Sequence, residues 1–334
     1  MRTAGILVAV IAAAAVAIGA TIFLLPAGPS APTELKVATL RGACGISFTE
    51  VLDSLGTDLK AGVDVVMVPL DGVPVEVDAL LRGEVDVAII PVEFLPDNVG
   101  KGTGLRLLLM DMSQYQALVA QPSIDSVAKL DGKRIGVFKP TSTYLTLQAY
   151  LREAGFRITE GDPKPGEVTL VNLPIPAMPD ALQRREVDAV ATIGPTTIQS
   201  VEKGGVVVST FGEWSGRLGL KAPAPLITFV TTNAKLQEKK AGIDALLRAR
   251  QSAVEDWVEA DKVVGKLYTE RCGLPGDMAA KYHQWLLSYI WRGPPVGDEV
   301  VQGIQDHLTL LAKHNIVGTG GPSIPEVLRG LLGR

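Results

Sequence analysis

The feature that most constrains the fold is a segment that occurs twice. Residues 78–91 read DALLRGEVDVAIIP and residues 180–195 read DALQRREVDAVATIGP, so Asp78 matches Asp180 and Asp86 matches Asp188. Each copy predicts the end of a short helix, a corner made by Gly or Arg, and an apolar strand opened by Val-Asp. A continuous apolar run such as residues 87–90 fits a strand buried on both faces, as in a parallel sheet. The repeat therefore predicts two α/β lobes built in the same order.

Length and net charge indicate the number of lobes and the kind of partner. The 334 residues exceed what one hydrophobic core usually holds and suit two lobes. The net charge of −4 comes without a basic block interleaved with aromatic residues, which disfavours nucleic acid as a partner.

The first 32 residues indicate export. An uncharged run at residues 4–25, apolar except for Thr21, follows Arg2 and precedes the Pro-rich PAGPSAPT. This pattern is typical of a secretory signal or of a retained membrane anchor, and its length of 22 residues without a clear A-x-A cleavage site favours the anchor. Either alternative places the folded part outside the cytoplasm.

Two cysteines, Cys44 and Cys272, lie far apart in the sequence. An even count suits an oxidising compartment, but the favoured interpretation is two separate small buried side chains, with pairing left open. No Cys/His spacing typical of zinc ligands occurs, so no metal site and no cofactor is predicted.

Polar turns follow the predicted strands in both lobes. A strand at residues 35–40 runs into Arg41-Gly42 and a predicted helix at residues 47–59, while a strand ending at residue 137 leads to residues 139–144 (KPTSTY) and a second helix. A Gly-bearing or hydroxyl-rich turn at a helix start can bind an anion. The residues after the repeated strands, Pro91-Val92-Glu93 and Pro195-Thr196-Thr197, fall where open α/β sheets usually bind ligands.

The order of these parts resembles a known family. The run LDGKRIGVFKPTST, the two A-L-x-x-x-E-V-D units and the segment from PLITFVTTNAKL to TERCGLP together resemble the extracytoplasmic solute-binding proteins of ABC importers, of the nitrate/sulfonate/taurine and thiamine-precursor type. The resemblance covers about residues 35 to 320. It departs from the family at the second-lobe turn, where Pro140-Thr141-Ser142 replaces the usual Gly-Ser.

The resemblance implies a fold, a domain division and a function. The fold is α/β, two-lobed and periplasmic-binding-protein-like (type II), with two parallel-rich sheets, flanking helices and a two-strand hinge. Residues 1–32 would be the anchor or signal with a Pro-rich linker, residues 33–115 and 225–334 lobe 1, and residues 116–224 lobe 2. The function would be extracytoplasmic capture of a small, anionic solute for an ABC permease and its ATPase, with the membrane contacted through the N-terminal segment.

Carrying the family's cleft over to this sequence gives a set of candidate ligand contacts. They are Arg41, Gly42, Ser47, Val92, Glu93, Tyr115, Thr141, Ser142, Thr143, Thr196 and Thr197. Arg41 and Lys139, which flank the predicted cleft, favour an anionic group on the ligand, whereas Glu93 favours an amine-bearing ligand. The alternative for each charge is a solvated loop residue, and Thr141–Thr143 could serve simply as a helix cap.

An enzyme on the same fold, of the chorismate-dehydrating or thiamine-pyrimidine type, is the alternative function. Catalysis would need an acid, a base or a nucleophile in the cleft. The three histidines, His283, His307 and His314, fall in predicted C-terminal helices far from the candidate loops. An anchored sensor domain is a third possibility, but the sequence contains no signalling module. We therefore expect a binding protein and not an enzyme.

Overall fold

The computed structural model describes residues 31–41, 48–318 and 321–333. The described residues from Thr33 to Gly333 form one compact unit. Of the predicted anchor or signal segment with its linker at residues 1–32, residues 1–30 lie outside the described part, and so do Gly42, Cys44 and Ser47. Within the described part, no helix is both long and apolar enough to cross a membrane.

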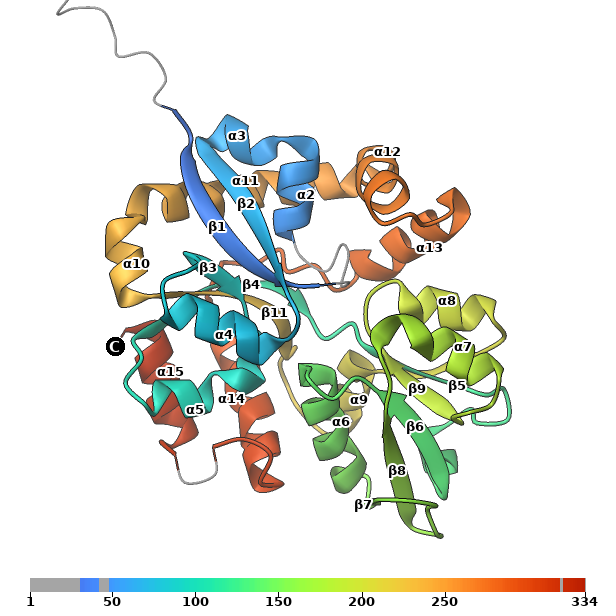
Figure 1. The fold of residues 1–334 in the computed structure, drawn as a ribbon. Helices are drawn as coiled ribbons and strands as arrows, with labels where there is room; N and C mark the ends of the chain where they lie inside the picture. The colour runs from blue at the N-terminus through green and yellow to red at the C-terminus, as the bar shows by residue number, and fades with distance from the viewer. Residues whose placement is uncertain (1–30, 42–47, 319–320, 334) are drawn as a thin grey trace, which may run out of the picture. The chain divides into compact units, whose positions relative to one another are not determined.

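The chain folds into two mixed sheets with helices on both faces (Figure 1). The first sheet has the order β2-β1-β3-β11-β4 and consists of β1 (Thr33–Leu40), β2 (Val63–Leu70), β3 (Val87–Ile89), β4 (Leu105–Ser113) and β11 (Pro225–Thr232). The strands β1, β2 and β3 run parallel, and β11 is antiparallel to both of its neighbours. The predicted two-lobed α/β architecture is confirmed.

The second sheet has the order β10-β5-β9-β6-β8-β7. It consists of β5 (Ala117–Ala120), β6 (Lys133–Val137), β7 (Arg157–Thr159), β8 (Glu167–Asn172), β9 (Ala189–Thr192) and β10 (Val206–Thr210). The chain enters this sheet directly after β4 and returns to the first sheet as β11. Here β6 pairs in parallel with both β8 and β9, as β1 pairs with β2 and β3 in the first sheet.

Helices cover both faces of each sheet (Figure 1). Around the first sheet lie α2 (Phe48–Leu55), α3 (Thr57–Ala61) and α11 (Lys240–Val258) on one side, and α4 (Val73–Leu81), α5 (Pro96–Val99), α14 (Asp298–Lys313) and α15 (Ile324–Leu332) on the other. Around the second lie α6 (Ser142–Glu153) and α9 (Phe211–Arg217) on one face and α7 (Met178–Gln183) and α8 (Thr196–Glu202) on the other.

Short helices complete the C-terminal part and the loops. They are α10 (Asn233–Glu238), α12 (Ala260–Val263), a π-helical turn η4 (Val264–Arg271), α13 (Gly276–Leu287), and the 3₁₀ turns η1 (Val92–Phe94), η2 (Val127–Leu130) and η3 (Ile175–Ala177). One predicted helix, at residues 47–59, is instead split into α2 and α3. Gly56 separates them with a φ of 64°, a left-handed conformation that glycine adopts at little cost.

The repeated segment forms the same structure in both sheets. The Asp86 amide donates to the Lys36 carbonyl (2.9 Å) and its carboxylate accepts from the Lys36 amide (3.0 Å). Asp188 makes the same two bonds with Arg134, at 2.8 and 2.9 Å. Each aspartate therefore fixes the start of an inner strand against its parallel neighbour, which explains why Val-Asp recurs at both positions.

The two copies of the repeat have different residues at the left-handed corner position. Gly83 (φ 74°) and Arg185 (φ 58°) occupy the same left-handed position after α4 and α7. For a residue with a Cβ, the left-handed conformation costs about 1–2 kcal/mol. Glycine avoids this cost, but the larger entropy of its unfolded state offsets part of the gain in stability. An added Cβ at Gly83 would lie 3.7 Å from Lys235 Cε, an ordinary contact, so a substitution there meets only the backbone cost.

We therefore expect opposite effects from two matched substitutions. Arg185→Gly should raise the free energy of unfolding by about 0.5–1 kcal/mol, and Gly83→Ala should lower it by about 1 kcal/mol. Urea unfolding monitored by circular dichroism measures both. Two changes of the same sign would show that the corner conformation does not determine stability at these sites.

Cys272, which directly follows η4, is disulfide-bonded. The chain contains one other cysteine, Cys44, which lies outside the described residues. The favoured interpretation of two separate, unbonded cysteines is therefore wrong, because Cys272 is not a free thiol. The sequence alone cannot show whether two cysteines so far apart lie close together in the fold.

Candidate ligand site

Two cavities lie where loops from both sheets meet. The inner one has a volume of about 20 Å³, room for about one water molecule, and is lined by Leu40, Val73, Ile89, Pro91, Thr141, Ser142, Ile193, Leu226 and Ile227. The outer one has about 370 Å³, a size suited to a small organic ligand, and is lined by Leu40, Arg41, Asp71, Phe138, Pro174, Ile175 and Pro176. Leu40, the last residue of β1, lines both cavities.

Most of these lining residues follow the carboxyl ends of parallel strands. Arg41 and Asp71 come directly after β1 and β2, and Phe138 comes directly after β6. The turn Pro174–Pro176 follows β8. Open α/β sheets characteristically bind ligands at this edge, so the position of the cavities agrees with the expectation from the repeated strands.

Arg41 supplies the positive charge of the outer cavity. Its Nε donates to Asp71 Oδ1 (2.6 Å) and its Nη2 donates to the Pro69 carbonyl (2.9 Å). Both charged side chains are more than half exposed, at 58% and 76%. The outer cavity therefore presents a paired cation and carboxylate against an apolar wall. Such a pair can bind the two charges of a zwitterion or, through Arg41, a single anionic group.

The α6 N-terminus contributes the hydroxyl groups of the inner cavity. Thr141 occupies the N-cap position, yet its Oγ1 donates to the Phe138 carbonyl (2.6 Å) and does not cap the helix. The first-turn amides of an α-helix have no intrahelical acceptor and favour an anion. Thr143, 2% exposed, has no hydrogen-bond partner for its hydroxyl among the described residues. The geometry thus brings Thr141 and Ser142 to the cavity and buries Thr143 beside them.

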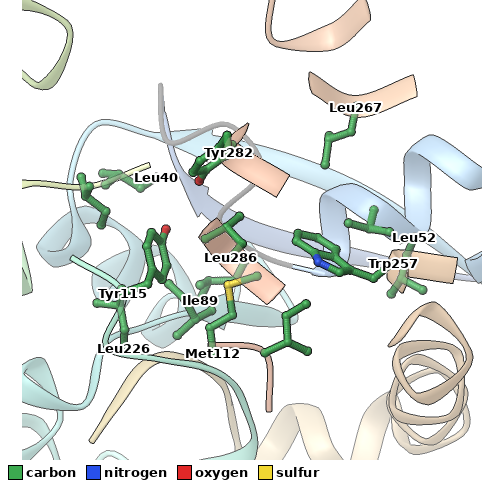
Figure 2. Packing of buried hydrophobic residues seen from close by; sticks show 14 of the residues in the cluster. Leu40, Leu52, Ile89, Met112, Tyr115, Leu226, Trp257, Leu267, Tyr282 and Leu286 are labelled. Carbon is green, nitrogen blue, oxygen red and sulfur yellow. The ribbon is translucent and has the colours of Figure 1, made fainter. Parts of the chain in front are cut away.

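The other sequence-predicted contacts lie away from the cavity linings. Val92 and Glu93, in η1, are buried, and Tyr115 is fully buried in the segment between β4 and β5. Figure 2 shows Tyr115 packed in the same cluster as Leu40 and Leu226. Burial raises the pKa of the Tyr115 hydroxyl well above its ordinary value.

The hydroxyl groups after β9 serve the local backbone. Thr196 Oγ1 donates to the Ile193 carbonyl (2.6 Å), and Thr197 Oγ1 lies 2.8 Å from Thr192 Oγ1. Lys139 is exposed and its Nζ lies 5.8 Å from the centre of the Tyr144 ring. These residues do not line either cavity. Their role as ligand contacts stays a prediction.

Glu93 lies in a buried polar network and not at a cavity wall. Its Oε1 is 2.9 Å from His307 Nε2 on α14. The expectation that all three histidines lie far from the candidate loops is therefore wrong for His307. His307 was expected in a C-terminal helix, but only the tertiary fold brings that helix, α14, back against η1.

The apolar wall of the outer cavity was not among the sequence-predicted contacts. Phe138 and the turn Pro174–Pro176 follow β6 and β8 as directly as Thr196 follows β9, so the same strand-end rule could have identified them. Among the described residues, no group of three or more His, Cys, Asp or Glu side chains could hold a metal ion.

Comparison with known proteins identifies the family. Residues 28–264 match the NMT1-like family, which is more than half of the chain. The chain belongs to that family. It is also 30% identical over 169 residues to the taurine-binding periplasmic protein of Escherichia coli (strain K12). That match covers 48% of this chain and 49% of the relative, so the chain matches only about half of the relative's length.

Solved structures confirm the fold class. The periplasmic aliphatic sulphonate binding protein SsuA from Escherichia coli superposes with a TM-score of 0.66 at 18% identity, covering 90% of this chain and 92% of that one. A Candida albicans protein described as exhibiting the generic periplasmic binding protein structural fold gives a TM-score of 0.58 at 16% identity, with coverage of 90% and 96%. The chain has the periplasmic-binding-protein fold.

Proposed function

We propose that this chain is the substrate-binding subunit of an ABC importer. The observation that carries the proposal is the outer cavity, to which one sheet contributes a paired cation and carboxylate and the other an apolar wall. A ligand that touches both walls stabilises the arrangement in which they approach, and this differential affinity drives closure. The name of the taurine-binding relative supports a small organic anion or zwitterion as the solute.

The proposed mechanism is binding and delivery without covalent chemistry. Among the residues that the structure describes, those lining the two cavities include no histidine and no cysteine. In the proposed division, residues 33–115 and 225–334 form lobe 1 and residues 116–224 form lobe 2. The closed form would dock on a membrane permease, with its ATPase driving transport. The protein would act outside the cytoplasm, held near the membrane or released according to the fate of residues 1–32.

Taurine and ethanesulfonate test the ligand class, because they share a sulfonate and a two-carbon chain and differ by the ammonium group. We expect taurine to stabilise the purified protein in a thermal-shift assay, by about 2.7 kcal/mol at 100 times its dissociation constant. Nitrate, longer sulfonates and thiamine precursors extend the screen. Binding of none of these, with turnover of a candidate substrate instead, would favour an enzyme on this fold.

Substitutions in the Arg41–Asp71 pair should separate the two charges of the ligand. Arg41→Gln should weaken both taurine and ethanesulfonate about tenfold, because each loses a charge-assisted hydrogen bond to its sulfonate. Asp71→Asn should weaken taurine but not ethanesulfonate, since only taurine has an ammonium group for the carboxylate. Isothermal titration of both variants measures these affinities. Equal losses for both ligands in both variants would assign the pair a purely structural role.

A further inference from the structure

A buried hydrogen-bond network joins three elements that are distant in the sequence. Glu93 Oε1, in η1 after β3, accepts from Thr146 Oγ1 on α6 at 2.9 Å and lies 2.9 Å from His307 Nε2 on α14. The side chains of Glu93 and His307 are fully buried, and Thr146 is 0% exposed. One carboxylate oxygen therefore links the first sheet, α6 of the second sheet and α14.

The network continues to the segment where the chain crosses between the sheets. Gln114, between β4 and β5, has its Nε2 3.4 Å from His307 Nε2 and accepts at Oε1 from the Tyr150 hydroxyl of α6 (2.7 Å). Gln114 is 1% exposed and Tyr150 is fully buried. Thr146 and Tyr150, one turn apart on α6, thus both form hydrogen bonds to groups outside the second sheet.

Glu93 and Thr146 each lie a few residues along the chain from a residue that lines the inner cavity. Pro91, two residues before Glu93, lines the cavity from the first sheet, and Ser142 lines it from α6. Ser142 and Thr146 are four residues apart and so share one face of the helix. The Glu93–Thr146 hydrogen bond therefore fixes the distance between the two walls without itself reaching the cavity.

We infer that Glu93 and His307 are positioning residues of the ligand site, which hold the N-terminus of α6 against the Pro91 wall. This inference rests on the proposed binding function for its effect on affinity, but not for its effect on α6. A buried carboxylate without its partner is strongly unfavourable, so loss of either member of the pair releases the helix. The ligand would then meet a less ordered second wall and dissociate faster.

The chain offers a matched control at the other end of the same two helices. Glu153, the last residue of α6, has its Oε2 2.7 Å from His314 Nε2 and 2.8 Å from Lys313 Nζ. At about 1.5 Å per residue, Glu153 lies about 16 Å along the helix from Ser142. Glu153→Gln also removes a carboxylate that contacts a histidine, in this case on α6 itself and far from the cavity.

The first test is affinity for taurine, measured by isothermal titration and by dissociation rate at a temperature where circular dichroism shows each variant folded. We expect Glu93→Gln and His307→Gln to weaken binding at least tenfold, mainly through faster dissociation, and Glu153→Gln to change it less than twofold. The double variant E93Q/H307Q can restore a neutral hydrogen-bonded pair, so it should bind more tightly than either single variant. Singles that bind as the control does would overturn the inference.

The second test needs no ligand and separates this inference from the proposed function. Hydrogen exchange of the ligand-free protein, followed in the peptide spanning residues 142–150, should be at least tenfold faster in Glu93→Gln than in wild type, and unchanged in Glu153→Gln. If taurine does not bind wild type, the proposed ligand class fails while this exchange result still decides the inference. Unchanged exchange in Glu93→Gln would refute it.

Discussion

Replacing Arg250 by methionine should lower the free energy of unfolding by about 3–5 kcal/mol. Arg250, on α11, is 4% exposed, and its Nε lies 3.2 Å from Oδ1 of Asp111, which is fully buried on β4. Its Nη2 also donates to the backbone carbonyls of Asp111 (3.2 Å) and Trp291. Methionine fills much of the volume of the arginine stem but removes the guanidinium, so the buried carboxylate loses an ion pair and two carbonyls lose a donor.

Arg248→Met provides the control, because Arg248 is exposed on the same helix and has no ion pair among the described residues. Both substitutions remove one positive charge and introduce the same side chain. Urea unfolding followed by circular dichroism should give a loss below about 0.5 kcal/mol for Arg248→Met. Comparable losses in the two variants would mean that the Arg250–Asp111 pair contributes no more than a surface charge does.

The Arg250–Asp111 pair also shows where prediction from sequence stops. The strands other than β7 were predictable because each contains an apolar run. The repeated Val-Asp corner was predictable because identical aspartates accept the same hydrogen bond from the neighbouring strand. The pairing of Asp111 with Arg250 was not, since 139 residues separate them. The strand β7 was missed for a different reason. It is a three-residue edge strand with no buried residue, so it leaves no apolar pattern.

The candidate site was predictable to the level of loops but not of side chains. The polar turns at the predicted helix starts indicated Arg41, Thr141 and Ser142, and these three residues line the cavities. The strand-end rule indicated Glu93, which follows β3 but turns into the core towards His307. A strand end fixes where a loop begins, whereas the direction of each side chain depends on neighbours contributed by distant elements such as α14.

The largest effect of pH on stability should come from Glu76. This residue lies on α4 with no exposed surface, and neither carboxylate oxygen has a hydrogen-bond partner among the described residues. Burial raises the pKa of the Glu76 carboxyl from 4.5 to about 8. At neutral pH the folded protein therefore keeps this carboxyl protonated, whereas the unfolded chain releases the proton.

The sign of the pH dependence follows from these two pKa values. Below pH 4.5 the Glu76 carboxyl is protonated in both states and causes no loss of stability. Between pH 4.5 and about 8 the unfolded state alone is ionised, so the free energy of unfolding falls by about 1.4 kcal/mol per pH unit. The loss reaches about 3 kcal/mol at pH 7 and about 5 kcal/mol above pH 8, where both states are ionised.

Glu76→Met should remove this loss, because methionine has a similar length and no titrating group. We expect the variant to be more stable than wild type by about 3 kcal/mol at pH 7, with the difference growing towards pH 8.5 and shrinking towards pH 5. Urea unfolding at these three pH values measures the difference. Glu255→Gln, which changes an exposed glutamate on α11, should follow the wild-type profile. Parallel pH profiles for Glu76→Met and wild type would show that the carboxyl is hydrated or paired in the folded protein, since only an isolated buried carboxyl retains its proton at neutral pH.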